Sequence, residues 1–530
     1  MGYVLGISSG LWRAGGQKEE FFGIVRKGYQ ALTYGVTFTQ IDIDTVTEFK
    51  DPFLRKGIEE LKRFGISFGF HGETLATTSR EVIMLDSAIK DIYDMTHQRL
   101  IEHLKNAGEL GAKYVLFHAS ENTPFQMLFR EFQPSKLVDF WGRPIKELIE
   151  SEKFLEKFVF ESEEKIKEFL WGFERSYHIS QLDRKKEEKK ILEKTILEFK
   201  QQLEKEKNEN EKTNLKMEIK KLELQKEAIE KAIEYYKNEC LKVIDSYDLH
   251  YGPERFAYYV VAKYLNEKKD PIWMGIVGRQ LSDEEIIKHP ELWVGAVATK
   301  YIWGHFNPRI HEDPKPILEK YKMYIVFETQ MAAQGQEGMM RIAHPKELYY
   351  LAKNLGTPYA AWALDIEHVL SCGIDPEEAI KNLPEDAGKY LKVVHITYPS
   401  PLNPSHYPIP LGSEAQEYVY KLLYILRQKG FKDGWIIYER GSAPIQQTII
   451  VLRKIKEFLE KDTPPEELPP EFYGFKIDEP EVIRQRQIIL QHALDPIKGL
   501  VSIPEEDHTF LSRIALEKGR LEQWKKGEMR

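Results

Sequence analysis

The sequence predicts an α/β protein whose main part is a (β/α)8 barrel. Eight short apolar runs have the length and the turn-residue borders of buried strands, and helical segments separate them. Strands that alternate with helices pair in parallel, and eight such units suit a closed barrel with its active site at the carboxyl ends of the strands. The expected strands are residues 3–9, 36–44, 66–70, 114–117, 324–327, 360–364, 391–394 and 435–438.

Glycines mark where two of the expected helices end. The amphipathic helix over residues 87–110 stops at Gly111, and the helix over residues 53–64 stops at Gly65. Both stops are expected because glycine readily adopts the left-handed conformation that closes a helix. Further helices of the repeat are expected at residues 21–32, 345–355, 376–382, 414–429 and 446–459.

About 200 residues after the fourth expected strand break the alternation, far more than a loop between a strand and a helix contains. Residues 126–319 are therefore expected to form an insertion. Within it, apolar residues recur at alternating spacings of four and three on two arms joined by the polar residues 208–214, with Lys226 as the polar member of the stripe. This heptad pattern predicts an antiparallel coiled-coil hairpin at about residues 185–240.

Both signs of charge are interspersed on the outer faces of the predicted hairpin. This pattern favours faces that are simply solvated over faces that bind nucleic acid, and it leaves open whether the hairpin binds a protein partner. Two aromatic-rich helices, expected at residues 255–265 and 291–303, lead back to the barrel. The barrel itself is assigned to residues 1–125 and 320–460.

The end of the chain is expected to be a separate segment. The proline-rich residues 463–470 cannot continue a helix and mark a boundary. Residues 461–530 are therefore assigned to a linker and a helical C-terminal tail, with helices expected at residues 481–493 and 510–525. No motif that carries chemistry is recognisable in this tail, so packing on the barrel or on a partner is expected.

Composition restricts the classes of protein that remain. The formal net charge of −8 offers no global attraction to nucleic acid, so phosphate binding would need a local basic patch or bound cations. The two cysteines, Cys240 and Cys372, lie in unrelated regions, which excludes a disulfide framework and a cysteine metal site and fits a reducing cytoplasm. No window approaches about 18 uninterrupted apolar residues, so we expect neither a membrane span nor export.

Six of the eight expected strands end in a histidine or a carboxylate. One such residue is more often a hydrogen-bonded core histidine or a helix cap than a ligand. Six at a common rim would require six independent coincidences, and a ring of ligands explains them together. The six residues are His71, His118, Glu328, Asp365, His395 and Glu439.

Imidazole and carboxylate groups suit divalent zinc, manganese and iron, and a carboxylate can bridge two cations. Two cations about 4 Å apart can activate a water molecule and stabilise a developing oxyanion, which is an arrangement suited to phosphodiester hydrolysis. His368 lies three residues after Asp365, so both side chains can face the same centre. We therefore expect a cluster of two or three cations at this rim.

Four residues in neighbouring loops are further candidates. His406 lies in a turn-rich loop and is a candidate metal ligand, although it could equally be a surface histidine. Arg440 is a candidate for binding a substrate phosphate, with pairing to Glu439 as the alternative. Gln334 and Gln336 lie in a segment with several glycines that needs no function, and Gln334 is a candidate substrate contact.

At these residues the sequence resembles the superfamily that joins endonuclease IV with the xylose-isomerase-like TIM barrels. The resemblance covers about residues 1–125 and 320–460 and leaves the insertion and the tail outside. It is carried by Phe70-His71, Phe117-His118, Val326-Phe-Glu328, Leu364-Asp365-Ile-Glu-His368, Val394-His395 and Tyr438-Glu439.

The resemblance implies different roles for these residues. The four ligands shared with sugar isomerases and epimerases would be Glu328, Asp365, His395 and Glu439. His71 and His118 resemble the endonuclease IV branch, where they hold an additional metal ion. His368 and His406 would resemble ligands of a third ion, but Ser405 stands where that branch has an aspartate.

The resemblance and the ligand pattern together predict a metal-dependent phosphodiester hydrolase similar to an apurinic/apyrimidinic endonuclease of DNA repair. Its catalytic residues would be Glu328 and Glu439, its cations zinc or else manganese, and its substrate DNA with abasic sites. The alternative is a metal-dependent isomerase or epimerase of a small sugar or sugar phosphate that uses the shared ligands for proton transfer. A third hypothesis is an interaction module that binds a protein partner through the hairpin, and the intact ligand ring argues against it.

Overall fold

The structure is a computed structural model of the 530-residue chain. It describes residues 2–11, 32–33, 35–43, 45–72, 83–120, 137–205, 209–245, 253–332, 340–399, 407–439 and 445–474. One compact unit comprises Met1–Lys167 and Leu249–Gly474, and a second includes Glu168–Asp248.

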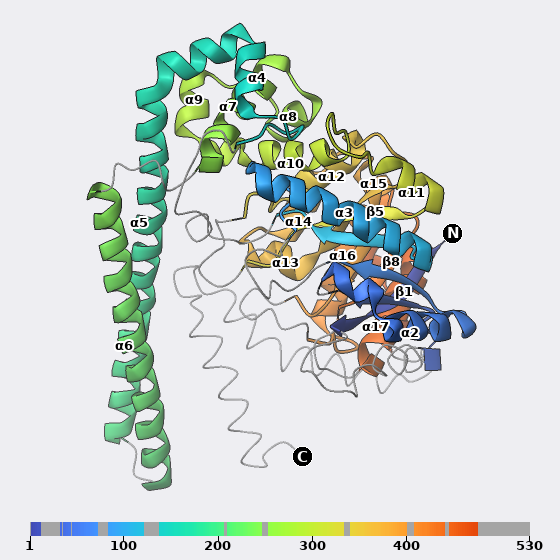
Figure 1. Cartoon of the computed structure of the whole chain (residues 1–530). Helices are drawn as coiled ribbons and strands as arrows, with labels where there is room; N and C mark the ends of the chain where they lie inside the picture. Colours follow the sequence, from blue (N-terminus) through green and yellow to red (C-terminus); the bar gives the residue numbers. More distant parts are fainter. Residues whose placement is uncertain are drawn as a thin grey trace. The chain divides into compact units, whose positions relative to one another are not determined.

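Eight parallel strands close into a barrel in chain order, and β8 pairs with β1 (Figure 1). This confirms the predicted (β/α)8 fold. Each expected strand is present, and β1 and β7 extend two residues beyond the expected ends. The strands are β1 (Tyr3–Leu11), β2 (Phe38–Asp42), β3 (Ser67–His71), β4 (Tyr114–His118), β5 (Tyr324–Glu328), β6 (Ala360–Asp365), β7 (Leu391–Ile396) and β8 (Gly434–Tyr438).

Parallel pairing brings the polar strand ends to one rim. The residues that face each other in register there are Asp42 and His71, His118 and Glu328, and Asp365 and His395. Beneath this rim the interior is filled by inward-facing apolar side chains, as in other small barrels. They include Phe38, Tyr114, Leu116, Val326, Ala361, Ala363, Val393 and Ile437.

The helices of the repeat surround the strands and begin and end at recognisable caps. The Asp51 side chain accepts from the Phe53 amide at the start of α2, and Gly111 closes α3 with a φ of +82°, as its position predicted. The expected helix at residues 21–32 lies, apart from its last residue, outside the described residues. The helices are η2 (Val46–Lys50), α2 (Pro52–Arg63), α3 (Lys90–Leu110), α12 (Pro345–Asn354), α13 (Ile366–Ser371), α14 (Pro376–Lys381), α15 (Ala387–Tyr390), α16 (Glu414–Gln428) and α17 (Ile445–Glu460).

Much of the segment expected as an insertion belongs to the same compact unit as the barrel. Helix α11 packs on α3, and α10 packs on α12 and on α7. The aromatic and aliphatic surfaces of these helices are buried, with Trp273, Tyr259 and Tyr301 enclosed completely. The helices are α4 (Ile145–Ser151), α7 (Pro253–Lys268), α8 (Pro271–Ile276), α9 (Asp283–Lys288), η5 (Pro290–Leu292), α10 (Val294–His305) and α11 (Lys315–Tyr321).

The proline-rich segment after the barrel folds into two short 3-10 helices, η6 (Pro465–Glu467) and η7 (Pro470–Tyr473). Phe472 of η7 is buried against Tyr420 and Phe458, so this segment packs on α16 and α17. The helices expected at residues 481–493 and 510–525 lie outside the described residues.

Two long helices, α5 (Lys153–Lys205) and α6 (Glu209–Asp245), run alongside each other over the expected hairpin (Figure 1). Ion pairs join them at Lys189–Glu230, Lys200–Glu223 and Lys226–Glu193, and Ile196 and Ile219 are buried. Residues 209–214, expected as part of the turn, belong to α6, where Glu209, Glu211 and Lys212 are good helix formers. Within the described part of the chain, no helix is long and apolar enough to cross a membrane.

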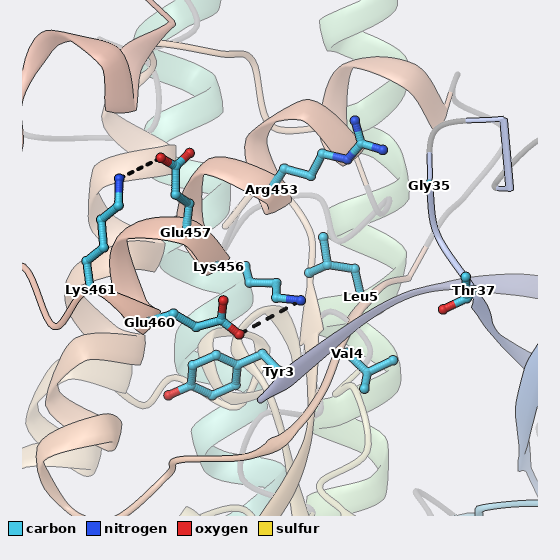
Figure 2. Close-up of a pocket in the computed structure, with 10 residues that line it drawn as sticks. All are labelled: Tyr3, Val4, Leu5, Gly35, Thr37, Arg453, Lys456, Glu457, Glu460 and Lys461. Atoms are coloured by element: carbon cyan, nitrogen blue, oxygen red, sulfur yellow. Dashed lines mark hydrogen bonds and ion pairs between the residues drawn. The ribbon is translucent and has the colours of Figure 1, made fainter. Parts of the chain in front are cut away.

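A cavity of about 560 Å³ lies at the opposite end of the barrel from the polar rim (Figure 2). It is lined by the first residues of β1, by Gly35 and Thr37 before β2, and by the end of α17 with Lys461 after it. Two of its lysines pair with neighbouring glutamates: Lys461 with Glu457 at 2.7 Å and Lys456 with Glu460 at 3.8 Å. The strand-end residues lie at the other end of the strands, so this cavity is not where they converge.

Candidate metal centre

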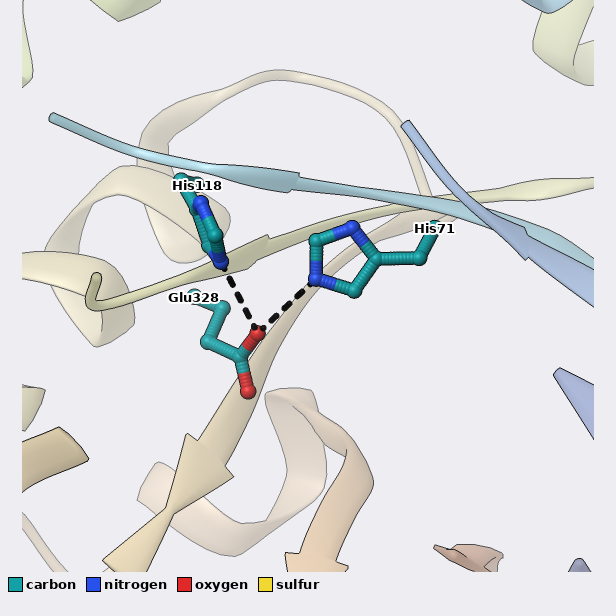
Figure 3. Close-up of side chains that lie close together, drawn as sticks. All are labelled: His71, His118 and Glu328. Atoms are coloured by element: carbon teal, nitrogen blue, oxygen red, sulfur yellow. Dashed lines mark ion pairs between the residues drawn. The ribbon is translucent and has the colours of Figure 1, made fainter. Parts of the chain in front are cut away.

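Glu328, the last residue of β5, lies at the centre of the polar rim and is fully buried. One of its oxygens, Oε2, faces two imidazoles from the strands β4 and β3. His71 Nε2 is 3.5 Å and His118 Nε2 is 3.8 Å from this oxygen (Figure 3). Both histidines end their strands, so the pleat of the barrel directs them inward together.

The other oxygen of Glu328 faces a second group of residues. His395 Nδ1 lies 2.6 Å from Glu328 Oε1, 3.0 Å from Glu439 Oε2 and 3.7 Å from Asp365 Oδ2. These side chains come from β6, β7 and the residue after β8. Glu328 therefore belongs to two sets of candidate ligands, one with His71 and His118 and one with Asp365, His395 and Glu439.

The donor atoms in each set fit a divalent cation. Within each set they lie within 4.8 Å of one another. Several are buried and have no hydrogen bond of good geometry among the described residues, although His395 Nδ1 and Glu328 Oε1 lie 2.6 Å apart. These atoms are both oxygens of Glu328, Oδ2 of Asp365 and Nδ1 of His395. Buried polar atoms are normally hydrogen-bonded, and converging lone pairs without donors are what a cation satisfies. Imidazole and carboxylate donors in this mixture suit zinc and manganese.

The charges in the cluster change the pKa values of its members. Burial raises the pKa of Glu328, but the neighbouring His395 imidazole outweighs this and holds it below its usual range. Burial lowers the pKa of His395, but Glu328 and Glu439 raise it well above its ordinary value. Burial raises the pKa of Asp365 to about 7, with the charges of Glu439 and Glu328 adding to it. A cation must displace protons held here, so binding should strengthen as pH rises.

His368 also lies at this centre. The Asp365 carboxylate caps α13 by accepting from the His368 amide at 2.8 Å, which holds the two residues together. The His368 ring contacts the Thr329 carbonyl through Nδ1 at 2.8 Å, so Nδ1 carries a hydrogen, and Nε2 lies 3.9 Å from Asp365 Oδ2. Its ring centroid is 5.9 Å from that of His118. The structure thus brings His368 beside both ligand sets.

The four loop candidates His406, Arg440, Gln334 and Gln336 lie outside the described residues. Their roles as a ligand and as substrate contacts stay predictions. Glu439, which precedes Arg440, is described, and its side chain is 14% exposed. It is the least buried of the carboxylates in the cluster.

Two buried residues of β2 that contact the cluster, Asp42 and Gln40, were not predicted from the sequence as site residues. Asp42 ends β2 next to His71 and accepts from the Ser8 hydroxyl at 3.3 Å. Burial raises its pKa, and the positive charge of His71 opposes this. The strand-end pattern that found the other residues could have found Asp42. Gln40, whose amide oxygen lies 2.9 Å from His395 Nε2, carries no such signal because it lies two residues below the rim.

A buried ionic network connects loops of the barrel unit to helix α7. Arg341 pairs with Glu254 of α7 and lies 3.3 Å from Asp86 Oδ2, and the same aspartate oxygen accepts from Ser120 at 2.9 Å. Ser120 follows His118 by two residues. A helix encoded far outside the expected barrel boundaries therefore takes part in holding the loop after β4.

No protein-family model and no curated protein matches the chain. Solved structures similar to it include D-psicose 3-epimerase with D-tagatose from Clostridium cellulolyticum H10, at 10% identity and a TM-score of 0.35 over 87% of this chain and 95% of that one. A xylose isomerase domain protein from Alicyclobacillus acidocaldarius is 10% identical, with a TM-score of 0.33 over 83% of this chain and 92% of that one. Endonuclease IV from Thermus thermophilus is 12% identical, with a TM-score of 0.33 over 87% of this chain and 100% of that one.

Identities and TM-scores this low carry no argument about activity, and the assignment of the fold depends on the closed barrel itself. Both branches named in the sequence analysis occur among these structures. The chain is similar to xylose-isomerase-like TIM barrel proteins, with endonuclease IV and sugar epimerases among them.

Proposed function

We propose that the protein is a metal-dependent hydrolase of phosphodiester bonds, acting on DNA at abasic sites as an apurinic/apyrimidinic endonuclease does. The observation that supports this is the position of Glu328, whose two oxygens face two different ligand sets. A carboxylate so placed can bridge two cations. One cation would need only the set of Glu328, Asp365, His395 and Glu439.

When bound, zinc or manganese ions would lower the pKa of a water molecule and stabilise charge that develops on a phosphate oxygen. The chain supplies the frame for this chemistry. His71 and His118 hold one side of Glu328, and Asp365 and His395 hold the other. Glu439, with 14% of its side chain exposed, is the most accessible carboxylate of the cluster and is suited to accept a proton from the attacking water.

The second candidate function is isomerisation or epimerisation of a small sugar or sugar phosphate. One observation favours it: the set of Glu328, Asp365, His395 and Glu439 is complete without the two remaining histidines. In that case Glu328 and Glu439 would transfer protons on the substrate carbon. His71 and His118 would then have no role as ligands, which is why we rank this function second.

Two measurements on the purified protein test the proposal. Elemental analysis should find at least two transition-metal ions per chain, because His71 and His118 exceed the needs of a single cation. Incubation with a duplex containing one abasic site, in zinc or manganese, should give a nick at that site. With a formal net charge of −8, binding should be weak and should weaken further with salt.

The variant His71→Ala separates the two functions. Cleavage should be abolished if His71 anchors a required cation, whereas an isomerase with an intact four-ligand set should lose little activity. His289→Ala is the matched control, since His289 is exposed and pairs only with nearby Glu291 among the described contacts. Epimerisation of a ketose or ketose phosphate at an enzymatic rate, with the duplex left intact, would contradict the hydrolase and establish the alternative.

A further inference from the structure

Strand β2 provides a buried amide to a metal-ligand candidate on the far side of the barrel. Gln40 is completely buried, and its Oε1 lies 2.9 Å from Nε2 of His395 on β7. The same oxygen accepts from the hydroxyl of Tyr114 on β4 at 2.8 Å. Neither β4 nor β7 is adjacent to β2 in the barrel, so these three side chains meet across its interior.

The chemistry of an amide oxygen fixes where the hydrogen lies. A carbonyl-type oxygen only accepts hydrogen bonds, so the hydrogen between Gln40 and His395 belongs to Nε2 of the imidazole. A neutral imidazole with its hydrogen on Nε2 has its lone pair on Nδ1. Nδ1 is the atom that lies 2.6 Å from Glu328 and 3.0 Å from Glu439.

We propose that Gln40 is a positioning residue that holds His395 in the tautomer with hydrogen on Nε2, so that Nδ1 is presented to a divalent cation. The inference depends on the metal centre of the proposed function and is independent of the substrate. Ligating histidines commonly donate their second nitrogen to an oxygen acceptor, and the loss of that acceptor weakens metal binding.

The opposite orientation of the amide defines the competing state. If the Gln40 nitrogen faced His395, it would donate to Nε2, and the imidazole would carry its hydrogen on Nδ1. That hydrogen would point at the carboxylates of Glu328 and Glu439, and Nδ1 could not bind a cation. In the structure Oε1 faces both His395 Nε2 and the Tyr114 hydroxyl, which is the first orientation. A hydroxyl can donate to an amide oxygen or accept from an amide nitrogen, so the Tyr114 contact is compatible with it without imposing it.

Three variants test the role of the acceptor. Gln40→Met has a similar length and no acceptor oxygen, Gln40→Glu keeps an oxygen at the same place, and Tyr114→Phe removes the other donor while leaving the acceptor. Zinc affinity is measured by competition with a chromophoric chelator, and the absorption spectrum of the cobalt-substituted protein reports the ligand set. The thermal midpoint without metal controls for damage to packing.

We expect Gln40→Met to bind zinc about 10–100-fold more weakly, with an altered cobalt spectrum and a metal-free midpoint close to that of the wild type. Gln40→Glu should restore the affinity, and Tyr114→Phe should leave it nearly unchanged. In the zinc-loaded wild type, long-range proton–nitrogen spectra of labelled histidine should place the hydrogen of His395 on Nε2.

Several results would overturn the inference: wild-type zinc affinity in Gln40→Met, an equal loss in Gln40→Glu, a hydrogen on Nδ1, or a wild type that binds no zinc. A wild type that binds zinc and loses affinity in Gln40→Met supports the inference whether or not the protein cuts DNA. Failure of the hydrolase proposal is therefore distinguishable from failure of this one.

Discussion

The rim of the barrel and the paired helices α5 and α6 are both rich in ionisable residues, but their charges lie in opposite surroundings. On the helices, Lys189 and Lys226 pair with glutamates at 2.8 Å while roughly a third of each lysine side chain remains exposed. At the rim, Glu328, Asp365 and His395 are almost completely buried.

The difference shows which charges need an explanation. An exposed ion pair replaces contacts with water by a contact between two side chains, with little net gain in stability. Such a pair is compatible with solvation alone. A buried carboxylate has lost its water and must be compensated by donors or by a cation. Both oxygens of Glu328 lack a hydrogen bond of good geometry among the described residues and face imidazoles, which are themselves metal ligands when neutral. This identifies the rim as the candidate site.

Burial alone does not identify a site. The network of Arg341, Glu254 and Asp86 is as deeply buried as the rim, but the guanidinium of Arg341 compensates its two carboxylates. Arg341 also donates to the Tyr258 hydroxyl at 2.8 Å. We therefore interpret this network as structural and the rim, where carboxylates and imidazoles converge without arginine or lysine among the described contacts, as functional.

The largest effect is expected from Glu328→Gln, which keeps the shape of the shared residue and removes its charge. Both ligand sets lose a member, so metal content should fall below two ions per chain and DNA cleavage by more than about 100-fold. Metal analysis and a nicking assay measure these quantities. Glu291→Gln, at an exposed residue, is the control, and full metal content in Glu328→Gln would contradict a shared ligand.

Disrupting the buried network of Arg341, Glu254 and Asp86 should lower the stability of the protein and leave its catalytic activity unchanged. Arg341→Met would leave Glu254 and Asp86 buried without their cation, at a cost of about 3–5 kcal/mol in the free energy of unfolding. Urea denaturation measures the loss. Arg279→Met, which removes an exposed partner of Glu285, should leave the midpoint unchanged. Equal effects of the two variants would show that burial does not separate these ion pairs.

A moderate effect of pH is expected from His97 and His305, whose Nδ1 atoms face each other at 3.2 Å inside the barrel unit. Burial lowers the pKa of both, more strongly than the hydrogen bond to the Glu312 carbonyl raises that of His97. The charge of His311 lowers both pKa values further, and that of His97 also lowers the pKa of His305. As the pH falls, the folded chain therefore binds fewer protons at these two histidines than the unfolded chain does. Their contribution to stability is therefore lost as pH falls below about 6.5.

The thermal midpoint measured from pH 8 to 5 tests this expectation by difference. The pKa values of His71, His368 and His395 are raised, so these residues contribute with the opposite sign. The double variant His97→Gln/His305→Gln should lose less stability at acid pH than the wild type does. Asp94 and Glu312, which lie near the pair, remain in both proteins and cancel in the comparison. Identical pH profiles would refute the assignment.

The smallest effect is expected on the helical side of the comparison. Replacing residues 185–240 with a short Gly/Ser linker should leave the thermal midpoint and the metal content of the barrel nearly unchanged, because α5 and α6 bury Ile196 and Ile219 and pair charges within their own unit. Calorimetry and metal analysis check this. Insoluble protein, or loss of the metal, would show that the hairpin supports the barrel.

Local patterns in the sequence were sufficient for the strands and their polar ends. Strand β6 is a continuous apolar run that ends at Asp365, and its length and borders are visible without any partner. Helix ends were visible where one residue decides them, as at Gly111. The expectation that residues 209–214 belong to the turn was wrong, since α6 begins at Glu209. Glutamate and lysine in this segment favour an exposed helix.

Long-range relations could not be read in this way. The amide of Gln40 meets His395 across the barrel, 355 positions away in the chain, and no periodicity marks it. The same holds for Glu254, which reaches Arg341 from a helix that the sequence placed in a separate insertion. Such contacts depend on how distant segments pack, and composition and spacing do not contain that information.

The sequence by itself determined the barrel, the order of its strands and the residue types at its rim, because strand length, helix spacing and strand-end chemistry are local properties. Only the tertiary structure decided that Glu328 turns one oxygen to His71 and His118 and the other to His395. Closure of the barrel fixes the register of β5 between β4 and β6, and that register places the Glu328 side chain beside His118 at the rim.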